Sequence, residues 1–142
     1  MSEIRWGVIG TGSIARAFAR DLQRVPGQKV TAVGSRTIEK ATAFASEFDC
    51  AALGSYQALV ESDVDAVYVA TPHPMHAPNT ILALSHGKPV LCEKPFAVNA
   101  RESSAMIAEA KNLEFEKAAN TRDRLSKIKE MAFGARSRDL PG

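Results

Sequence analysis

The sequence has little of several features that define particular classes of protein. It holds only two cysteines, Cys50 and Cys92, which lie far apart, each among small apolar residues. This arrangement predicts reduced core cysteines rather than a disulfide framework, and it favours a cytoplasmic protein. No apolar run is long enough to cross a membrane, and residues 1–6 carry both an acid and a base, unlike a signal peptide.

An excess of charge of one sign is also lacking. The chain has 18 Lys and Arg residues against 16 Asp and Glu residues, a formal net charge of +2. This balance argues against a nucleic acid or a membrane surface as the partner. With 142 residues, 45% of them hydrophobic, the chain fits one globular domain whose core needs no metal or disulfide.

What the sequence does contain is an alternation of short apolar runs with helical patterns. We predict strands at 5–9, 29–33, 51–53, 66–70 and 89–92, and helices at 13–24, 38–48, 56–60, 78–86 and 100–111. Ile14, Phe18 and Leu22 are expected on the buried face of the first helix, and Thr37 is expected to cap the second. The alternation predicts an α/β fold, a Rossmann-type doubly wound parallel sheet in three layers.

The predicted nucleotide-binding domain covers residues 1–112. Residues 113–142 form an atypical, highly charged tail with a helix expected over 122–133, and they contain no second core. Ligands of such sheets bind beyond the carboxyl ends of the strands, where the strand order reverses. The site should therefore lie in the loops that follow residues 9, 33, 70 and 92.

The first of these loops is rich in glycine. Gly10 and Gly12, with Thr11 between them, follow a strand and precede Ser13 and Ile14, which open a helix. This is the G-x-G-x-x-G/A pattern, completed by an alanine at position 15, in the context that the pattern requires. The first glycine permits a tight turn, the second lets a diphosphate approach the backbone, and the free helix amides bind it. The alternative is a glycine turn without a ligand.

The second loop carries a base where NAD-binding proteins carry an acid. Gly34, Ser35 and Arg36 end the second strand, and no carboxylate is present there to bind a ribose 2′-hydroxyl. Gly34 leaves room, Ser35 can donate a hydrogen bond, and Arg36 can form a forked pair with a 2′-phosphate. These residues predict NADP as the cofactor, with NAD as the second choice. The alternative is that Arg36 is a solvated loop charge.

The third loop holds Thr71, Pro72, His73 and His76, at the place where a nicotinamide would lie. We expect this loop to line the cofactor pocket, with one imidazole bonding ribose or substrate. A packing role for His73 is the alternative. A metal site is less well supported, because no third ligand has suitable spacing, and we predict none.

The fourth loop contains Glu93, Lys94 and Pro95. A lysine beside a cationic nicotinamide would have its pKa lowered, so Lys94 is a candidate proton donor or acceptor that Glu93 could orient. Both are also expected to border the cofactor, and Pro95 can take a cis peptide bond. The alternative is an exposed ion pair between Glu93 and Lys94.

Together these motifs resemble the Gfo/Idh/MocA family of NAD(P)-dependent oxidoreductases over residues 3–111. The matching segments are 7–12, 70–72 with His76, and 87–95. Segments 5–7, 73–76, 91–95 and 98–100 look most like the branch of dimeric dihydrodiol dehydrogenases and NADP-dependent xylose dehydrogenases. The resemblance implies hydride transfer between nicotinamide and a sugar or dihydrodiol-type alcohol, with Lys94 as the active-site lysine and Glu93 beside it.

The resemblance also implies a second, larger domain that forms the substrate wall and usually the oligomer interface. Family members are well over twice as long as this chain. We therefore expect an NADP-binding domain that is incomplete and poorly active alone, with a homo-oligomer as a further expectation. Residues 112–122 resemble the family's sixth strand, with a helix after it. The alternative function is a non-catalytic module that senses NADP(H) or pairs with another subunit.

Overall fold

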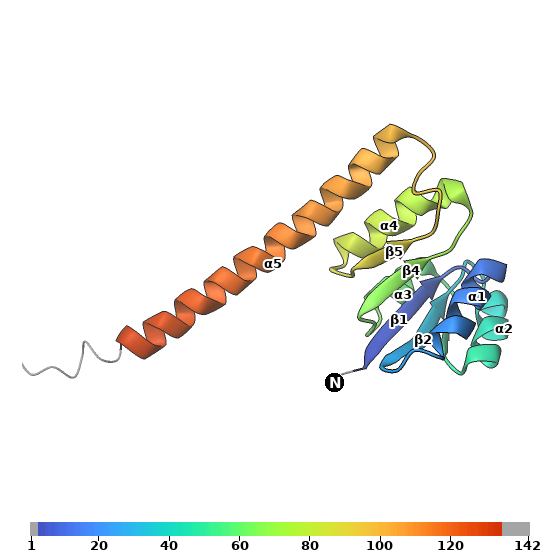
Figure 1. The fold of residues 1–142 in the computed structure, drawn as a ribbon, viewed down its shortest axis with the longest axis horizontal. Coiled ribbons are helices and arrows are strands. Elements are labelled where there is room, and N and C mark those ends of the chain that lie inside the picture. Colours follow the sequence, from blue (N-terminus) through green and yellow to red (C-terminus); the bar gives the residue numbers. More distant parts are fainter. Residues whose placement is uncertain (1–2, 135–142) are drawn as a thin grey trace, which may run out of the picture. The chain divides into compact units, whose positions relative to one another are not determined.

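The computed structural model describes residues 3–134, and they contain one five-stranded sheet whose strands are all parallel (Figure 1). The strand order is β3-β2-β1-β4-β5. The strands are β1 (Ile4–Ile9), β2 (Gln28–Gly34), β3 (Ala51–Leu53), β4 (Ala66–Val69) and β5 (Val90–Cys92). The chain builds outward from β1 to β3, then returns to place β4 on the other side of β1. The strand order therefore reverses between β1 and β4.

Both faces of this sheet are covered by helices, which are α1 (Ser13–Leu22), α2 (Ile38–Phe48), α3 (Tyr56–Glu61) and α4 (His76–Ser85). The chain also forms the 3-10 turn η1 (His73–Met75) and helix α5 (Ala100–Gly134). One core cluster joins α1 and α2 to the face that carries Val8, and the other joins α3 and α4 to the face that carries Ile9. Figure 1 shows α1 and α2 together on one face. The predicted three-layered Rossmann-type fold is confirmed.

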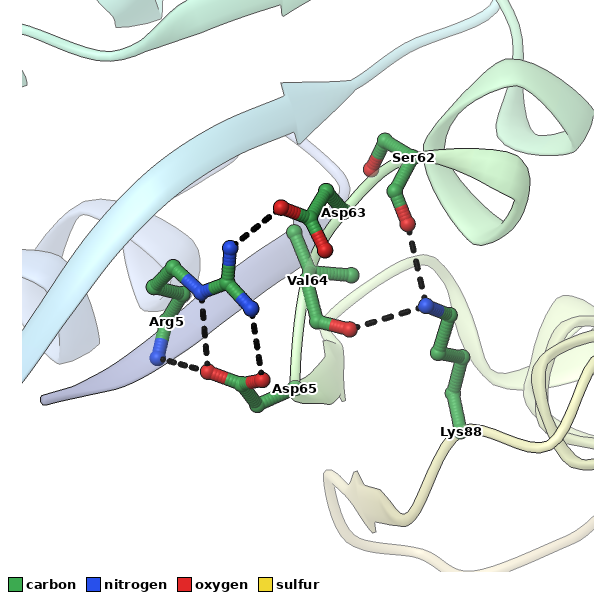
Figure 2. A network of polar contacts seen from close by, with 6 residues as sticks. All are labelled: Arg5, Ser62, Asp63, Val64, Asp65 and Lys88. Atoms are coloured by element: carbon green, nitrogen blue, oxygen red, sulfur yellow. Dashed lines mark hydrogen bonds and ion pairs between the residues drawn. The ribbon is translucent and has the colours of Figure 1, made fainter. Parts of the chain in front are cut away.

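A polar network ties the loop before β4 to the start of β1, at the edge of the sheet away from the strands' carboxyl ends (Figure 2). The Arg5 guanidinium donates to both carboxylate oxygens of Asp65, at 3.0 and 3.1 Å, and also pairs with Asp63. Lys88 Nζ donates to two carbonyl oxygens of the same loop, those of Ser62 and Val64, at 2.9 Å each. The network holds β1, β4 and the segment before β5 in register.

The packing of α1 agrees only in part with the sequence prediction. Phe18 and Leu22 pack against the core as expected, but Ile14 is 48% exposed, and the buried residues of the helix are Ala15 and Ala19. Small side chains let the helix approach the sheet closely, and the position of Ile14 leaves its side chain at the rim of a cavity. Thr37 is the N-cap residue of α2, as expected, but the predicted hydrogen bond from its hydroxyl is wrong, because the side chain makes no capping bond. Ser55 does cap α3, accepting from the Ala58 amide at 3.0 Å.

The chain divides into two compact units, residues 1–110 and 111–142. The described residues of the second unit belong to α5, which begins in the first unit, where Met106 is buried. The sixth strand expected within 112–122 is not found, because these residues are helical. They include two alanines and two glutamates and only one β-branched residue, Thr121, which favours a helix. Residues 135–142 of the predicted tail lie outside the described part.

Cys50 and Cys92 are both free and half-buried. Among residues 3–134, no helix combines the length and the apolar character that a bilayer crossing demands.

Candidate functional site

A cavity of about 1040 Å³ opens at the carboxyl ends of β1, β2, β4 and β5, where the strand order reverses. Every predicted site residue except Ser13 lines it. These residues are Gly10, Thr11, Gly12, Ile14, Ser35, Arg36, Thr71, Pro72, His73, His76, Glu93 and Lys94. Ser13 is exposed at the first position of α1, where only its backbone amide would serve a ligand. The structure therefore brings the four predicted loops together around one space.

Several lining residues were absent from the sequence prediction. They are Arg16, Thr37, Lys40, Ala43, Tyr56 and Ala70. Two of them had a usable signal in the sequence. Lys40 lies four residues after Arg36 at the start of α2, and Arg16 lies one turn after Ser13 in α1. Tyr56 reaches the cavity from α3, and only the packing of α3 beside β2 shows this.

The two glycines of the first loop do different things. Gly10 has φ +111°, and a Cβ there would lie 2.8 Å from the carbonyl oxygen of Ala70, so the fold itself requires glycine. Gly12 is the N-cap of α1 with φ −79°, and a Cβ there would meet nothing within 4 Å. Because Gly12 faces open space in front of the free α1 amides, the loop fits a diphosphate, which needs close approach to the backbone.

A basic end of the cavity follows β2. Arg36 and Lys40 are exposed, and neither pairs with a carboxylate in the described part of the chain. Burial raises the pKa of the Tyr56 phenol, and the nearby Arg36 guanidinium opposes this rise. Glu93, in the loop after β5, is the one acid among the lining residues. The end near Arg36 and Lys40 therefore offers two cations to an anionic group.

Arg16 is already engaged within the protein. Its Nε lies 3.0 Å from Glu47 Oε1, its Nη1 donates to the Thr11 carbonyl oxygen, and its guanidinium lies 5.6 Å from the centre of the Phe44 ring. These contacts join the glycine loop to α2. We therefore assign Arg16 to holding the loop in shape rather than to the free positive charge of the cavity.

Glu93 is held by a buried tyrosine. The Tyr68 hydroxyl donates to Glu93 Oε2 at 2.5 Å, and the Tyr68 ring stacks on Phe18 of α1 with 4.0 Å between centroids. The hydrogen bond from Tyr68 is the main cause that lowers the pKa of Glu93. Burial, followed by the contact with Glu93, raises the pKa of Tyr68. Glu93 is therefore kept as a carboxylate with a fixed orientation.

Lys94 is exposed beside this carboxylate. Its backbone amide donates to Glu93 Oε1 at 3.2 Å, and the peptide bond that joins it to Pro95 is cis. The contact between the two residues is thus made by the main chain of Lys94. No ion pair joins the Lys94 ammonium group to Glu93. This differs from the predicted alternative of a simple exposed ion pair.

The two histidines occupy different environments. His73 is exposed, whereas His76 is 1% exposed, and the ring centroids lie 5.6 Å apart. Both ring nitrogens of His76 face backbone carbonyl oxygens, those of Pro95 at 2.7 Å and Thr71 at 2.8 Å. His76 is therefore poorly placed for the predicted bond to ribose or substrate, and His73 is the imidazole that is free to reach a ligand. No group of three metal-ligating side chains occurs among the described residues.

Comparison with known proteins connects this site to a family. A family model described as an oxidoreductase family with an NAD-binding Rossmann fold, GFO_IDH_MocA, matches residues 4–116. The chain belongs to the GFO/IDH/MocA family. Its glycine loop, basic β2 end and Glu93-Lys94 segment all fall within the matched region, so the domain is an NAD(P)-binding Rossmann domain of these oxidoreductases.

Individual relatives agree with this assignment. Mouse trans-1,2-dihydrobenzene-1,2-diol dehydrogenase is 42% identical over 113 residues, which cover 77% of this chain and 34% of that protein. The scyllo-inositol 2-dehydrogenase (NADP(+)) IolU of Bacillus subtilis is 42% identical over 110 residues, which cover 76% of this chain and 34% of that protein. Among solved structures, KijD10, a 3-ketoreductase from Actinomadura kijaniata, matches with a TM-score of 0.75 and 38% identity. That crystal structure is a complex with NADP and TDP-benzene, and the match covers 79% of this chain and 35% of KijD10. The chain thus spans about a third of the length of these GFO/IDH/MocA relatives.

Proposed function

We propose that this domain binds NADP(H) in preference to NAD(H), and that it serves hydride transfer between the nicotinamide and an alcohol carbon of a sugar or dihydrodiol. The observation that carries the proposal is the open space at Gly12, in front of the α1 amides, at one side of a cavity whose other side is basic. The diphosphate of a dinucleotide fits the open space at Gly12, and the ribose 2′-phosphate of NADP fits the basic side of the cavity.

The preference for NADP rests on the end of β2. Ser35 is buried at the cavity wall, and Arg36 and Lys40 lie beside it with no carboxylate among the neighbouring lining residues. A ribose 2′-phosphate gains charge-assisted hydrogen bonds from such a set, whereas a 2′-hydroxyl finds no carboxylate to accept its hydrogen bond. Among the relatives, IolU is an NADP(+) dehydrogenase and KijD10 was crystallised with NADP, which supports the same preference.

The chemical role rests on the loop after β5. When bound, the nicotinamide would supply or accept the hydride. Oxidation of an alcohol carbon also releases the hydroxyl proton, which the neutral amine form of Lys94 would take, and reduction would draw a proton from its ammonium form. Glu93, fixed by Tyr68, keeps a negative charge beside Lys94. The substrate class is inferred from the dihydrodiol and inositol dehydrogenases among the relatives.

The 142-residue polypeptide should bind the cofactor but should turn over little substrate. The residues that we propose to hold the diphosphate and the 2′-phosphate all lie within residues 10–40, whereas hydride transfer also needs a substrate held within reacting distance of the ring. The relatives have about two thirds of their length beyond the matched region. We expect measurable NADPH binding and negligible oxidation of sugars or trans-dihydrodiols by this polypeptide.

Calorimetric titration with NADPH and NADH tests the cofactor preference. Arg36→Ala should raise the Kd for NADPH by about 10- to 100-fold, since one or two charge-assisted bonds are lost, and should leave NADH binding nearly unchanged. Lys40→Ala should act in the same direction. Arg24→Ala is the control, because it removes an exposed positive charge that does not line the cavity. Equal losses for both cofactors in Arg36→Ala would disprove the NADP assignment.

A further inference from the structure

His76 joins two loops that border the cavity from neighbouring strands. Thr71 follows β4 and Pro95 follows β5, and the carbonyl oxygens of these two residues lie 2.8 and 2.7 Å from Nε2 and Nδ1 of His76. The imidazole is 1% exposed, so water does not compete for either contact. A single buried ring therefore spans the two loops that hold His73 on one side and Lys94 on the other.

The chemistry of the partners determines what the ring does there. A carbonyl oxygen only accepts hydrogen bonds, so each contact is a hydrogen bond when the facing ring nitrogen carries a proton. The charged and titratable groups around the ring are His73 in η1, with 5.6 Å between ring centroids, and Glu93 and Lys94 in the loop after β5. The positive charge of His76 is one of the smaller causes, after Tyr68, that lower the pKa of Glu93.

The two loops depend on His76 to different degrees. Thr71 has a second support from α4, because Asn79 Nδ2 donates to Thr71 Oγ1 at 3.0 Å and Asn79 is itself buried. Its side chain and main chain are thus both held from one helix. The Pro95 carbonyl, in contrast, is held to α4 through the Nδ1 contact of His76. Loss of that contact should therefore release the Lys94–Pro95 segment more than the Thr71 loop.

We propose that His76 is a positioning residue that sets the Lys94–Pro95 segment against the Thr71–Pro72 segment and so shapes the nicotinamide half of the cavity. This inference rests on the proposed function, and it concerns only one half of the cofactor. The glycine loop and the Arg36 end come from β1 and β2, which His76 does not contact through either ring nitrogen. Binding of the adenosine half should therefore be independent of His76.

A matched pair of substitutions separates the two contacts. In His76→Gln the amide nitrogen takes the place of Nε2, which keeps the Thr71 bond and loses the Pro95 bond. In His76→Asn it takes the place of Nδ1, which keeps the Pro95 bond. The probes are NADPH and adenosine 2′,5′-bisphosphate, which lacks the nicotinamide half, titrated into the 142-residue chain.

His76→Gln should weaken NADPH binding about fivefold or more, and should change bisphosphate binding by less than about twofold. His76→Asn should bind NADPH more tightly than His76→Gln does. If His76 had a merely structural role, its substitution would weaken the binding of both ligands and lower the melting temperature. That result would overturn the inference. Unchanged NADPH binding in both variants would also overturn it. Wild-type protein that binds neither ligand would overturn the proposed function as well.

A measurement on the wild-type chain covers the case in which the variants do not fold. The sequence has three histidines, and His73 and His86 are exposed. In protein labelled with ¹⁵N-histidine, we expect a ring N–H signal of His76, donated by Nδ1 to the Pro95 carbonyl oxygen, that is protected from exchange with water. The absence of any protected ring N–H signal from His76 would show that the ring holds neither carbonyl and would overturn the inference.

Discussion

Gly12→Ala should separate cofactor binding from folding. The backbone of Gly12, with φ −79° and ψ −172°, is one that alanine adopts without strain, and the new methyl group would meet no atom within 4 Å. Alanine at a helix N-cap costs up to about 1 kcal/mol, while the stiffer unfolded chain returns about 0.4–1 kcal/mol. We therefore expect the free energy of unfolding to change by less than about 1 kcal/mol.

The same methyl group would occupy the space in front of the α1 amides where we place the diphosphate. Each charge-assisted hydrogen bond that is lost is worth about 1.5–3 kcal/mol, so losing one raises the Kd for NADPH at least about tenfold, and losing two raises it more than a hundredfold. Calorimetric titration gives the Kd, and urea unfolding followed by circular dichroism gives the stability. Both measurements are made on the same preparation.

Gly10→Ala is the matched control. Gly10 has φ +111°, and its Cβ would lie 2.8 Å from the Ala70 carbonyl oxygen. Backbone strain of about 1–3 kcal/mol and overpacking of about 1–3 kcal/mol predict a destabilisation of about 2–6 kcal/mol. A stable Gly12→Ala variant that binds NADPH as tightly as wild type would refute the placement of the diphosphate. A Gly12→Ala variant as unstable as Gly10→Ala would refute our account of the open space.

Three further predictions concern single side chains. The hydrogen bond from the Arg5 side chain is the main cause that lowers the pKa of Asp65 from 3.8 to about 2. The stability that Asp65 contributes is therefore present above pH 3.8 and lost as the pH falls toward 2. The free energy of unfolding in urea, measured across this range, should depend less on pH in Asp65→Asn than in the wild-type protein. An identical pH dependence in the two proteins would contradict the assignment. Tyr68→Phe should raise the pKa of Glu93 toward its ordinary value, measured by ¹³C NMR titration of the carboxyl carbons, and an unchanged pKa would argue against the role of the Tyr68 hydroxyl. Lys94→Ala should keep most of the NADPH affinity, because the phosphate contacts lie elsewhere; a loss in calorimetry as large as that of Gly12→Ala would contradict this.

Much of the site could be predicted because its residues follow strand ends. In a parallel sheet the carboxyl ends of all strands meet at one edge, so the loops after residues 9, 34, 69 and 92 converge without any knowledge of packing. The glycine pattern, Arg36 and the Glu93-Lys94 pair were found in this way. Lys40 was not predicted, because it lies in the first turn of α2 and not at a strand end.

Other features depend on which elements pack together. Gly34 was expected to leave room at the cavity, but a Cβ there would lie 2.9 Å from Leu59 Cβ, so the packing of α3 requires this glycine. His76 was expected to face a ligand, but the convergence of the β4 and β5 loops surrounds it with two carbonyl oxygens. Leu59 and Pro95 lie many residues away from Gly34 and His76 in the chain, so no local pattern could have identified these two contacts.

The sequence by itself determined the α/β alternation, the helix-opening glycine loop and the basic residue after β2, because each depends on the chemistry of a few consecutive residues. The tertiary structure alone decided which groups remain free for a ligand. Arg16 is bound to Glu47 and Thr11, and His76 is bound to two loops, whereas Arg36 and Lys40 have no carboxylate partner among the described residues. A side chain's availability is set by its neighbours in space, and two of these neighbours, Glu47 and Pro95, come from distant parts of the chain.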